Sequence, residues 1–268
     1  MKIKNQRNSV KHFDTDFDTL KAYIYRGEFE GYGGFLRPIK ELETIDLSYF
    51  VGIDDIIKAV QSNTQSFLDN SQASNVLLWG ARGCGKSSSM RAVLCDFLHR
   101  EDTLLRVIEV PKSSLAILPH LVDFLREQPY KFIIVCDDLS FGRADESYKA
   151  LKSILDGGFE AQAQNILFYA TSNMRHLLLE EYAQDTMHLS DMQDEIISLS
   201  DRFGICLGFY TLGSAEYINL VARYLGIQPH SLDSVLRQKA LNYATQKGSK
   251  NPRIAKEFVK LYQNGILC

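Results

Sequence analysis

Residues 80 to 87 combine glycines, a lysine and a serine at a spacing that suits phosphate binding. Gly80 is followed, after four residues, by Gly85, Lys86 and Ser87, which is the pattern of a P-loop. Glycines let the backbone turn its N–H groups inward around a phosphate chain at the positive end of the following helix. The Lys86 ammonium would then reach the β and γ phosphates, and the Ser87 hydroxyl would ligate the Mg²⁺ that they carry.

The residues on both sides of this loop are those that a P-loop requires. Residues 75–79 form an apolar run of strand length, and residues 88–100 place Met90, Val93, Leu94 and Phe97 at helical spacing. The alternative is a glycine-rich turn between two ordinary elements. The strand before the loop and the helix after it favour the P-loop.

Polar side chains follow the next two buried strands. Asp137 and Asp138 come directly after the apolar run "IIVC", and Asn173 follows the strand expected over 165–171. At the carboxyl end of a strand, Asp137 would hold Mg²⁺ through water, and Asp138 would align or deprotonate the attacking water. Asn173 would hydrogen-bond the γ phosphate or that water. The alternatives are that the two acids cap the next helix or turn and that Asn173 is a turn residue.

Strands and helices alternate along most of the chain. Besides the strand at 75–79, we expect strands at 104–110, 132–136, 165–171 and 204–210, and helices near 54–68, 118–126, 148–155 and 189–199. This alternation predicts an α/β fold, a doubly wound parallel sheet of five strands. Three further helical patterns after residue 210 predict a small helical domain. Residues 13–26 show helical spacing, and the glycines, aromatics and proline of 27–40 favour an irregular loop.

Composition indicates an ordinary globular protein. The 268 residues are 45% hydrophobic, the formal net charge is −3, and no apolar run approaches membrane-spanning length. The first residues lack the apolar core of a secretion signal, so we expect a cytoplasmic location and no membrane partner. A short basic arm precedes the first acid, which makes nucleic acid a weakly supported partner; such arms are more often solvated termini. Its residues are Lys2, Lys4, Arg7 and Lys11.

The five cysteines are dispersed and show no metal-binding or haem-attachment spacing. They are Cys84, Cys95, Cys136, Cys206 and Cys268. We expect reduced and mostly buried thiols. Cys84 lies inside the P-loop, where the helix dipole and Lys86 would favour the thiolate; the alternative is that it fills a variable loop position.

Taken together, these stretches resemble the AAA+ ATPases. "GARGCGKSS" is similar to their Walker A motif, "IIVCDD" to Walker B, "ATSN" to sensor 1, and "YFVGID" to the segment that packs on adenine. Arg202 in "SLSDRFG" resembles the arginine finger, and Arg253 in "NPRIAKEFV" resembles sensor 2. More closely, "CDDLSF", "SYKALKSILDGG" and "YATSNMRHL" are similar to the DUF815 family of bacterial ATPases, over about residues 45 to 260.

This resemblance implies an organisation and a site. Residues 1–45 would be an N-terminal accessory segment, 46–210 the nucleotide-binding core and 211–268 a helical lid, with ATP between core and lid. Arg253 would contact the nucleotide, and Arg202 would complete the site of a neighbouring subunit in a homo-oligomer, so that hydrolysis depends on assembly. The implied nucleotide-contacting residues are Gly80, Ala81, Arg82, Gly83, Cys84, Gly85, Lys86, Ser87, Ser88, Val51, Gly52 and Arg253.

Both arginines have plainer alternatives. Arg202 would pair with Asp201 or Glu195 near a helix end, and Arg253 would be an exposed residue of a first helical turn. The chain also departs from the usual pattern, because the second Walker B acid is Asp138 where AAA+ proteins have Glu, and because Gly142 follows "DLSF" where the family has an acid.

Three functions are compatible with these residues. The first is an oligomeric ATPase that remodels or loads a macromolecular partner, which the sequence does not identify. The second is an ATP-gated switch with little turnover, which the shorter Asp138 would permit. The third is a small-molecule kinase, which the helical tail and the position of Arg202 disfavour.

Overall fold

Seven β-strands form one sheet in the computed structural model, which describes residues 13, 15–28, 34–142, 145–157, 161–175, 177 and 198–267. The strand order is β2-β1-β4-β5-β6-β3-β7, in which every neighbouring pair is parallel except β1 and β2. The strands are β1 (Ala22–Arg26), β2 (Phe35–Pro38), β3 (Val76–Gly80), β4 (Leu105–Glu109), β5 (Lys131–Cys136), β6 (Ile166–Ser172) and β7 (Ile205–Phe209).

The predicted parallel sheet is confirmed, but it has seven strands rather than five. The five expected strands are β4, β5, β6, β3 and β7, and the chain before residue 45 adds β1 and β2 beyond β4. The prediction of a helix over residues 13–26 is therefore wrong, because Ala22–Arg26 forms β1. Buried Arg106 explains part of the difference, because its guanidinium donates to the Phe17 carbonyl at 2.6 Å and so ties this segment to β4. The expected loop at 27–40 likewise contains β2.

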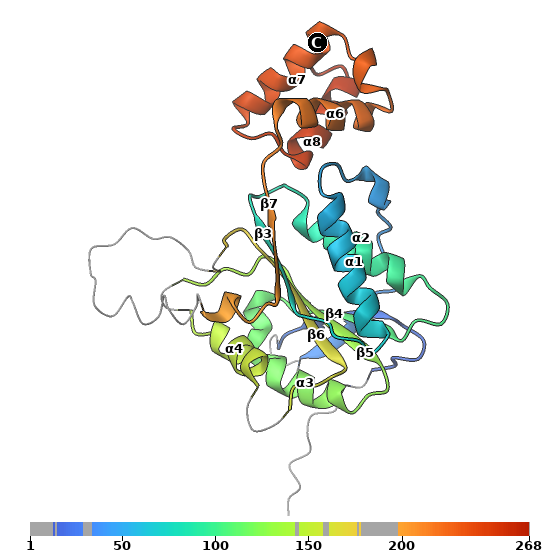
Figure 1. The fold of residues 1–268 in the computed structure, drawn as a ribbon, viewed down its shortest axis with the longest axis vertical. Helices are drawn as coiled ribbons and strands as arrows, with labels where there is room; N and C mark the ends of the chain where they lie inside the picture. Colours follow the sequence, from blue (N-terminus) through green and yellow to red (C-terminus); the bar gives the residue numbers. More distant parts are fainter. Residues whose placement is uncertain are drawn as a thin grey trace, which may run out of the picture.

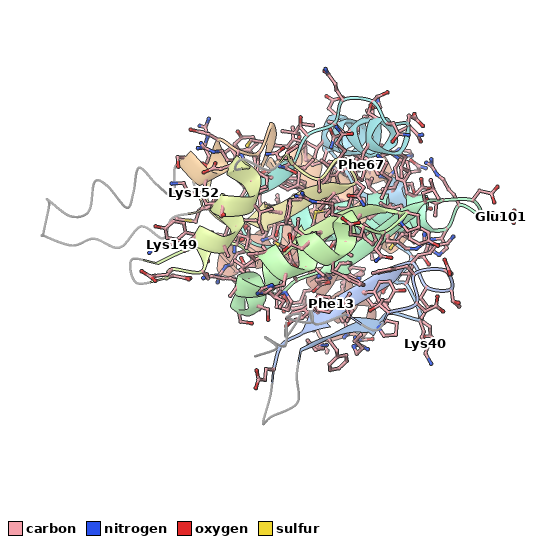
Figure 2. All side chains as sticks on the ribbon, turned by 90° about the horizontal axis from the view of Figure 1, so that it is seen from below. Phe13, Lys40, Phe67, Glu101, Lys149 and Lys152 are labelled. Atoms are coloured by element: carbon pink, nitrogen blue, oxygen red, sulfur yellow. The ribbon has the colours of Figure 1, made fainter. Side chains whose placement is uncertain are left out.

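Helices cover both faces of the sheet (Figure 1). Helices α1 (Asp54–Leu68) and α2 (Lys86–Leu98) pack on one face, and α3 (Leu118–Arg126) and α4 (Tyr148–Asp156) on the other. Two short 3₁₀ turns, η1 (Leu47–Tyr49) and η2 (Lys112–Ile117), precede α1 and α3. Figure 2 shows this division, with Phe67 of α1 on one side of the sheet and Phe13, packed with the α3 layer, on the other.

The central strands are buried on both faces, as parallel strands between two helical layers must be. All residues of β6 and all but the first of β5 are buried. Successive residues of one strand enter different cores, so Leu78 packs with the α1 and α2 layer and Leu77 with the α3 and α4 layer. Two hydrophobic cores therefore hold the carboxyl ends of these strands in place.

A separate apolar cluster forms the C-terminal helical unit. Its elements are α6 (Ser214–Leu225), η3 (Pro229–Ser231), α7 (Ser234–Gln246) and α8 (Pro252–Gln263). The side chains of Asp233 and Asn251 cap α7 and α8 by accepting hydrogen bonds from Leu236 N and Ile254 N. The three helices expected after residue 210 are thus present, while the boundaries at 45 and 210 stay predictions.

Two predictions lie outside the described residues. The basic arm of residues 2–11 is one, and most of the helix expected over 189–199 is the other. In the described ranges, no helix is both long and apolar enough to cross a membrane.

Candidate functional site

The loop between β3 and α2 needs its glycines. Gly80, Gly83 and Gly85 have φ values of +138°, +79° and +98°, a region that residues with a Cβ rarely adopt. A Cβ on Gly80 would also lie 2.0 Å from the Phe209 carbonyl oxygen of the neighbouring strand. The loop therefore wraps closely against β7 before it enters α2.

Lys86 is held inside this loop. Its side chain is buried, and Nζ donates hydrogen bonds to the carbonyl oxygens of Gly80 at 2.7 Å and Ala81 at 2.9 Å and to Asn173 Oδ1 at 3.1 Å. Burial lowers the pKa of Lys86, and nearby acidic groups, including Asp138, oppose that shift. The ammonium is thus positioned at the loop, where an anionic ligand would compensate its desolvation.

Ser87, Asp137 and Thr171 form a second network beside the loop. Asp137 Oδ1 accepts from Ser87 Oγ and from Thr171 Oγ1, both at 2.5 Å. Thr171 Oγ1 in turn accepts from the Asp138 amide at 2.9 Å. Residues from α2, from the end of β5 and from β6 therefore converge on one carboxylate.

Asn173 connects the two networks. Its Oδ1 accepts from Lys86, and its Nδ2 donates to a carboxylate oxygen of Asp138. Asp138 has φ +55°, a left-handed conformation that costs a non-glycine residue of order 1–3 kcal/mol. The structure therefore brings together Lys86, Ser87, Asp137, Asp138 and Asn173 at the carboxyl ends of β3, β5 and β6.

These residues fit a phosphate chain and its Mg²⁺. Helix α2 starts at Lys86 behind Gly85, which has no side chain to cap it, so its first N–H groups suit an anion. The Ser87 hydroxyl and the Asp137 carboxylate are in contact. Both supply oxygen atoms, which are the ligands that Mg²⁺ prefers. No cluster of three or more His, Cys, Asp or Glu side chains in the described residues is arranged to hold a metal; Mg²⁺ at such sites takes other ligands from phosphates and water.

The helical unit contacts the loop through the start of α8. Asn251 is buried and donates from Nδ2 to the Arg82 carbonyl at 3.1 Å, while a Cβ on Gly83 would lie 2.9 Å from that same nitrogen. The Arg253 amide donates to the Gly83 carbonyl at 3.4 Å, and the Arg253 side chain is exposed. The contact of Asn251 with the loop was not predicted from the sequence, because "NPR" is typical of a residue that only caps the start of a helix.

The segment expected to pack on adenine joins the core to the helical unit. Phe50 packs with the α1 and α2 layer, and its ring lies 3.8 Å from the position of a Cβ on Gly85. The next residue, Val51, packs with the helical cluster, and Gly52 has φ +76°. Val51 and Gly52 thus lie between the core that carries the P-loop and the C-terminal helical unit. The resemblance to AAA+ ATPases implies that the adenine of ATP binds there.

The remaining loop residues differ in exposure. Ala81, Arg82 and Ser88 are exposed, whereas Cys84 is buried. Burial raises the pKa of the Cys84 thiol, and Lys86 only partly opposes this shift. The expectation of a thiolate is therefore not supported, although Cys84 does lie in the loop. Of the other cysteines, Cys95 and Cys136 are buried and free, Cys206 is free and exposed, and Cys268 lies outside the described residues.

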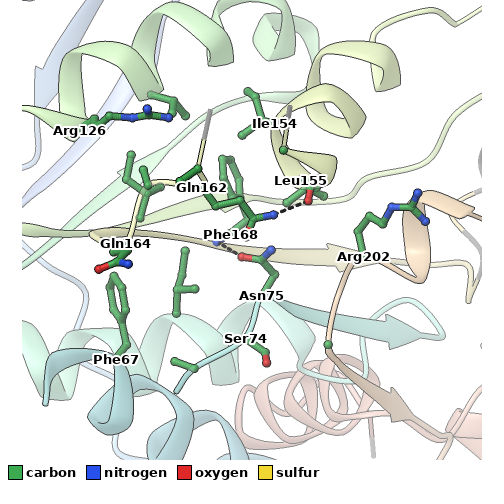
Figure 3. Close-up of a pocket in the computed structure, with 18 of the residues that line it drawn as sticks. Phe67, Ser74, Asn75, Arg126, Ile154, Leu155, Gln162, Gln164, Phe168 and Arg202 are labelled. Carbon is green, nitrogen blue, oxygen red and sulfur yellow. Dashed lines mark hydrogen bonds between the residues drawn. The ribbon is translucent and has the colours of Figure 1, made fainter. Parts of the chain in front are cut away.

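Arg202 lies at the opposite end of the sheet. It precedes β7, whereas Gly80 pairs with Phe209 at the end of that strand. Its guanidinium donates to the Asp156 carboxylate at the end of α4 and to the Ser198 carbonyl. Arg202 also borders a cavity of about 810 Å³ at the amino ends of the strands. Figure 3 shows it at one edge of that cavity, near the end of α4 that carries Leu155.

The fold of the chain is similar to that of two AAA+ ATPases of known structure. The RuvB Holliday junction branch migration motor of Thermotoga maritima is 16% identical, with a TM-score of 0.55 over 83% of this chain and 65% of that chain. The Orc1 protein of Aeropyrum pernix, in complex with DNA, is 15% identical, with a TM-score of 0.58 over 83% of this chain and 61% of that chain. At these identities the likeness shows the AAA+ fold.

The chain spans about 65% of the length of the RuvB chains that it matches. A search of curated proteins found no match to the sequence. The model of the family described as "Protein of unknown function (DUF815)" matches residues 18–266. Because this match covers nearly the whole chain, the protein belongs to the DUF815 family.

Proposed function

We propose that this protein is an AAA+ ATPase that couples the hydrolysis of MgATP to the remodelling or loading of a macromolecular partner. The observation that carries the proposal is the connected network of Lys86, Asn173 and Asp138 beside the contact between Ser87 and Asp137. A phosphate-binding cation, a pair of metal-binding oxygens and a second carboxylate lie at one edge of the sheet. This combination is what phosphoryl transfer to water requires.

Each residue has a role in the proposed reaction. The amides of residues 80–87 and Lys86 would bind the β and γ phosphates, and Ser87 and Asp137 would hold Mg²⁺, which would supply positive charge to those phosphates. Asp138 accepts a proton from the attacking water, and Asn173 orients that water or the γ phosphate. The products are ADP and inorganic phosphate. Arg253 contacts the nucleotide from the helical side, where the amide of the same residue already meets Gly83.

Arg202 has its role in a neighbouring subunit. It precedes the amino end of β7, and the P-loop lies beyond the carboxyl end of β3. An arginine supplied in trans stabilises charge on the transferring phosphoryl group. We therefore propose a homo-oligomer in which Arg202 leaves Asp156 and completes the site of the next copy.

The second candidate is an ATP-gated switch that binds nucleotide with little turnover. The conformation of Asp138 favours it, because this shorter acid is held by Asn173 in a left-handed backbone conformation. In this case the bound nucleotide would set the position of the helical unit through Asn251 and Arg253, and hydrolysis would be slow.

Calorimetry and turnover measurements test both candidates. ATP should bind the purified protein, more tightly with Mg²⁺ than with EDTA, and phosphate release per subunit should rise with protein concentration as copies assemble. Binding without turnover at any concentration would favour the switch. No heat of association with ATP and Mg²⁺ would contradict both candidates.

The partner is proposed by chemical class only. RuvB is named as a Holliday junction branch migration motor, and Orc1 was solved with DNA, which makes DNA the first partner to test. The net charge of −3 gives no general attraction to it. An Asp138→Asn protein held in ATP should retain labelled DNA in a fluorescence anisotropy assay if DNA is the partner. If it does not, the same protein is the bait for capturing a protein partner.

A further inference from the structure

One arginine of α2 forms ion pairs that the proposed mechanism does not use. Arg91 lies one helical turn after Ser87, and its Nη2 donates to Asp137 Oδ2 at 3.2 Å. The same nitrogen lies 3.9 Å from Glu109 Oε2, at the end of β4. A single guanidinium thus lies between two carboxylates at the carboxyl ends of neighbouring strands.

Both oxygens of the Asp137 carboxylate accept hydrogen bonds from this chain. Oδ1 accepts from Ser87 and Thr171, and Oδ2 accepts from Arg91. Two of these donors are neutral hydroxyls that remain compatible with a nearby cation. Arg91 carries a positive charge of its own, so it and Mg²⁺ would repel each other at the same carboxylate. Arg91 is 45% exposed, so its side chain has room to move.

Glu109 gives Arg91 a second partner at the same place. A guanidinium presents several N–H donors in a planar fork, so it can donate to a carboxylate on either side. The 3.9 Å separation from Glu109 is longer than the 3.2 Å separation from Asp137. In the structure, Arg91 therefore pairs more closely with Asp137, the acid proposed to bind Mg²⁺, than with Glu109.

We propose that Arg91 is a counter-ion of Asp137 and that it transfers to Glu109 when Mg²⁺ binds with the nucleotide. This proposal rests on the function proposed above, and it adds a positioning residue that tunes metal affinity. Without Mg²⁺, Arg91 stabilises the site, because its single positive charge offsets part of the negative charge of Asp137 and Glu109. It lowers the affinity for Mg²⁺, because it must leave Asp137 first.

The test measures the Mg²⁺ concentration at which ATP binding is half enhanced, by calorimetry at fixed ATP. Arg91→Ala should lower that concentration by about twofold to fivefold, the range of a partly exposed ion pair. It should also lower the melting temperature in EDTA more than in MgATP. Glu109→Gln should raise the Mg²⁺ midpoint, because Arg91 then has no second carboxylate to move to. Direct binding of Mn²⁺, followed by its paramagnetic resonance, gives the same comparison without turnover.

Two further variants make the result decisive. Arg100→Ala removes another exposed arginine, which pairs with Asp96 on α2 at the same 3.2 Å, and it should leave the Mg²⁺ midpoint unchanged. Arg91→Lys keeps the charge but not the fork, so its midpoint should lie between those of wild type and Arg91→Ala. Equal midpoints for wild type, Arg91→Ala and Glu109→Gln would overturn this proposal and leave the ATPase proposal intact. A wild-type protein that binds no ATP would overturn both.

Discussion

The two ends of the same sheet carry charged residues in different states. At the carboxyl ends of β3, β5 and β6, Asn173 contacts both Lys86 and Asp138, and Ser87 contacts Asp137, all within one chain. At the amino ends, Arg202 is paired with Asp156 beside a cavity of about 810 Å³. One end is a connected set of groups with complementary chemistry, and the other end holds a cation that its own chain neutralises.

The difference indicates which steps each end can affect. Strand β7 runs from Ile205 to Phe209, and at about 3.3 Å per residue it separates the two ends by roughly 16 Å. Arg202 precedes this strand and the P-loop lies beyond its far end, so one copy cannot join them. Variants at the carboxyl end should therefore alter nucleotide binding in a single chain, and variants at Arg202 should alter only turnover in an assembly.

The largest effect is expected at Lys86. Lys86→Ala removes the cation that would contact the phosphates and should lower ATP affinity by more than about 100-fold, since several charge-assisted hydrogen bonds are lost. Turnover should then be undetectable. Lys131→Ala is the matched control, because Lys131 is a partly buried lysine at the other end of the sheet. Calorimetry should show that only the Lys86 variant loses binding.

Arg202 should affect turnover without affecting binding. Arg202→Ala should lower phosphate release by about 10³-fold, the lower range for an arginine supplied in trans, and should leave the calorimetric ATP affinity unchanged. Mixing this variant with Lys86→Ala should restore part of the activity, because each copy supplies what the other lacks. If the mixture stays as inactive as the separate variants, Arg202 does not act between subunits.

Asp138 distinguishes the ATPase from the switch. Asp138→Asn keeps the shape of the side chain but removes the base, so turnover should fall by about 100-fold while ATP binding is retained. Phosphate release in a single-turnover assay measures the chemical step. A variant that hydrolyses ATP at the wild-type rate would show that Asp138 is not the catalytic base.

A smaller effect is expected where the P-loop meets α8. Gly83→Ala introduces a Cβ at φ +79° and 2.9 Å from Asn251 Nδ2, so the backbone strain of about 1–3 kcal/mol is joined by a clash. Gly248→Ala is the matched control, since Gly248 has φ +72° with nothing within 4 Å of its added Cβ. The melting temperatures of the two variants measure the backbone strain that both substitutions introduce. The ATP affinity should fall only for the Gly83 variant. Combining Gly83→Ala with Asn251→Ala should recover part of that loss.

Local patterns predicted the carboxyl end of the sheet well. A strand, a glycine-rich loop and a helix are adjacent in sequence around Lys86, and Asp137 and Asn173 each follow a continuous apolar run. Buried parallel strands are such runs, so their carboxyl ends are visible without knowledge of the fold. Arg91 also had a detectable signal, because it is four residues after Ser87 and shares its helix face.

Other features depend on contacts that are distant in sequence. The aromatic spacing of residues 13–26 is compatible with a helix, but Ala22–Arg26 forms a strand because it pairs with β2 and β4. Asn251 has the local signature of an N-cap, and its bond to Arg82 spans 169 residues. Such pairings are set by tertiary packing, which periodicity in one segment does not report.

The smallest predicted effect compares two thiols, one near each end of the sheet. Cys84 in the P-loop is buried, while Cys206 near the start of β7 is exposed. A maleimide reacts with an accessible thiolate. Burial raises the pKa of both thiols, so their difference in exposure decides which reacts first. In a protein carrying Cys268→Ser, Cys206 should therefore be labelled faster than Cys84, as mass spectrometry of digests would measure. ATP should slow only the residual reaction of Cys84, because the nucleotide covers the loop and stabilises its closed packing. Equal protection of both thiols would mean that ATP stabilises the whole chain rather than the carboxyl end, and the contrast between the two ends would then not extend to ligand binding.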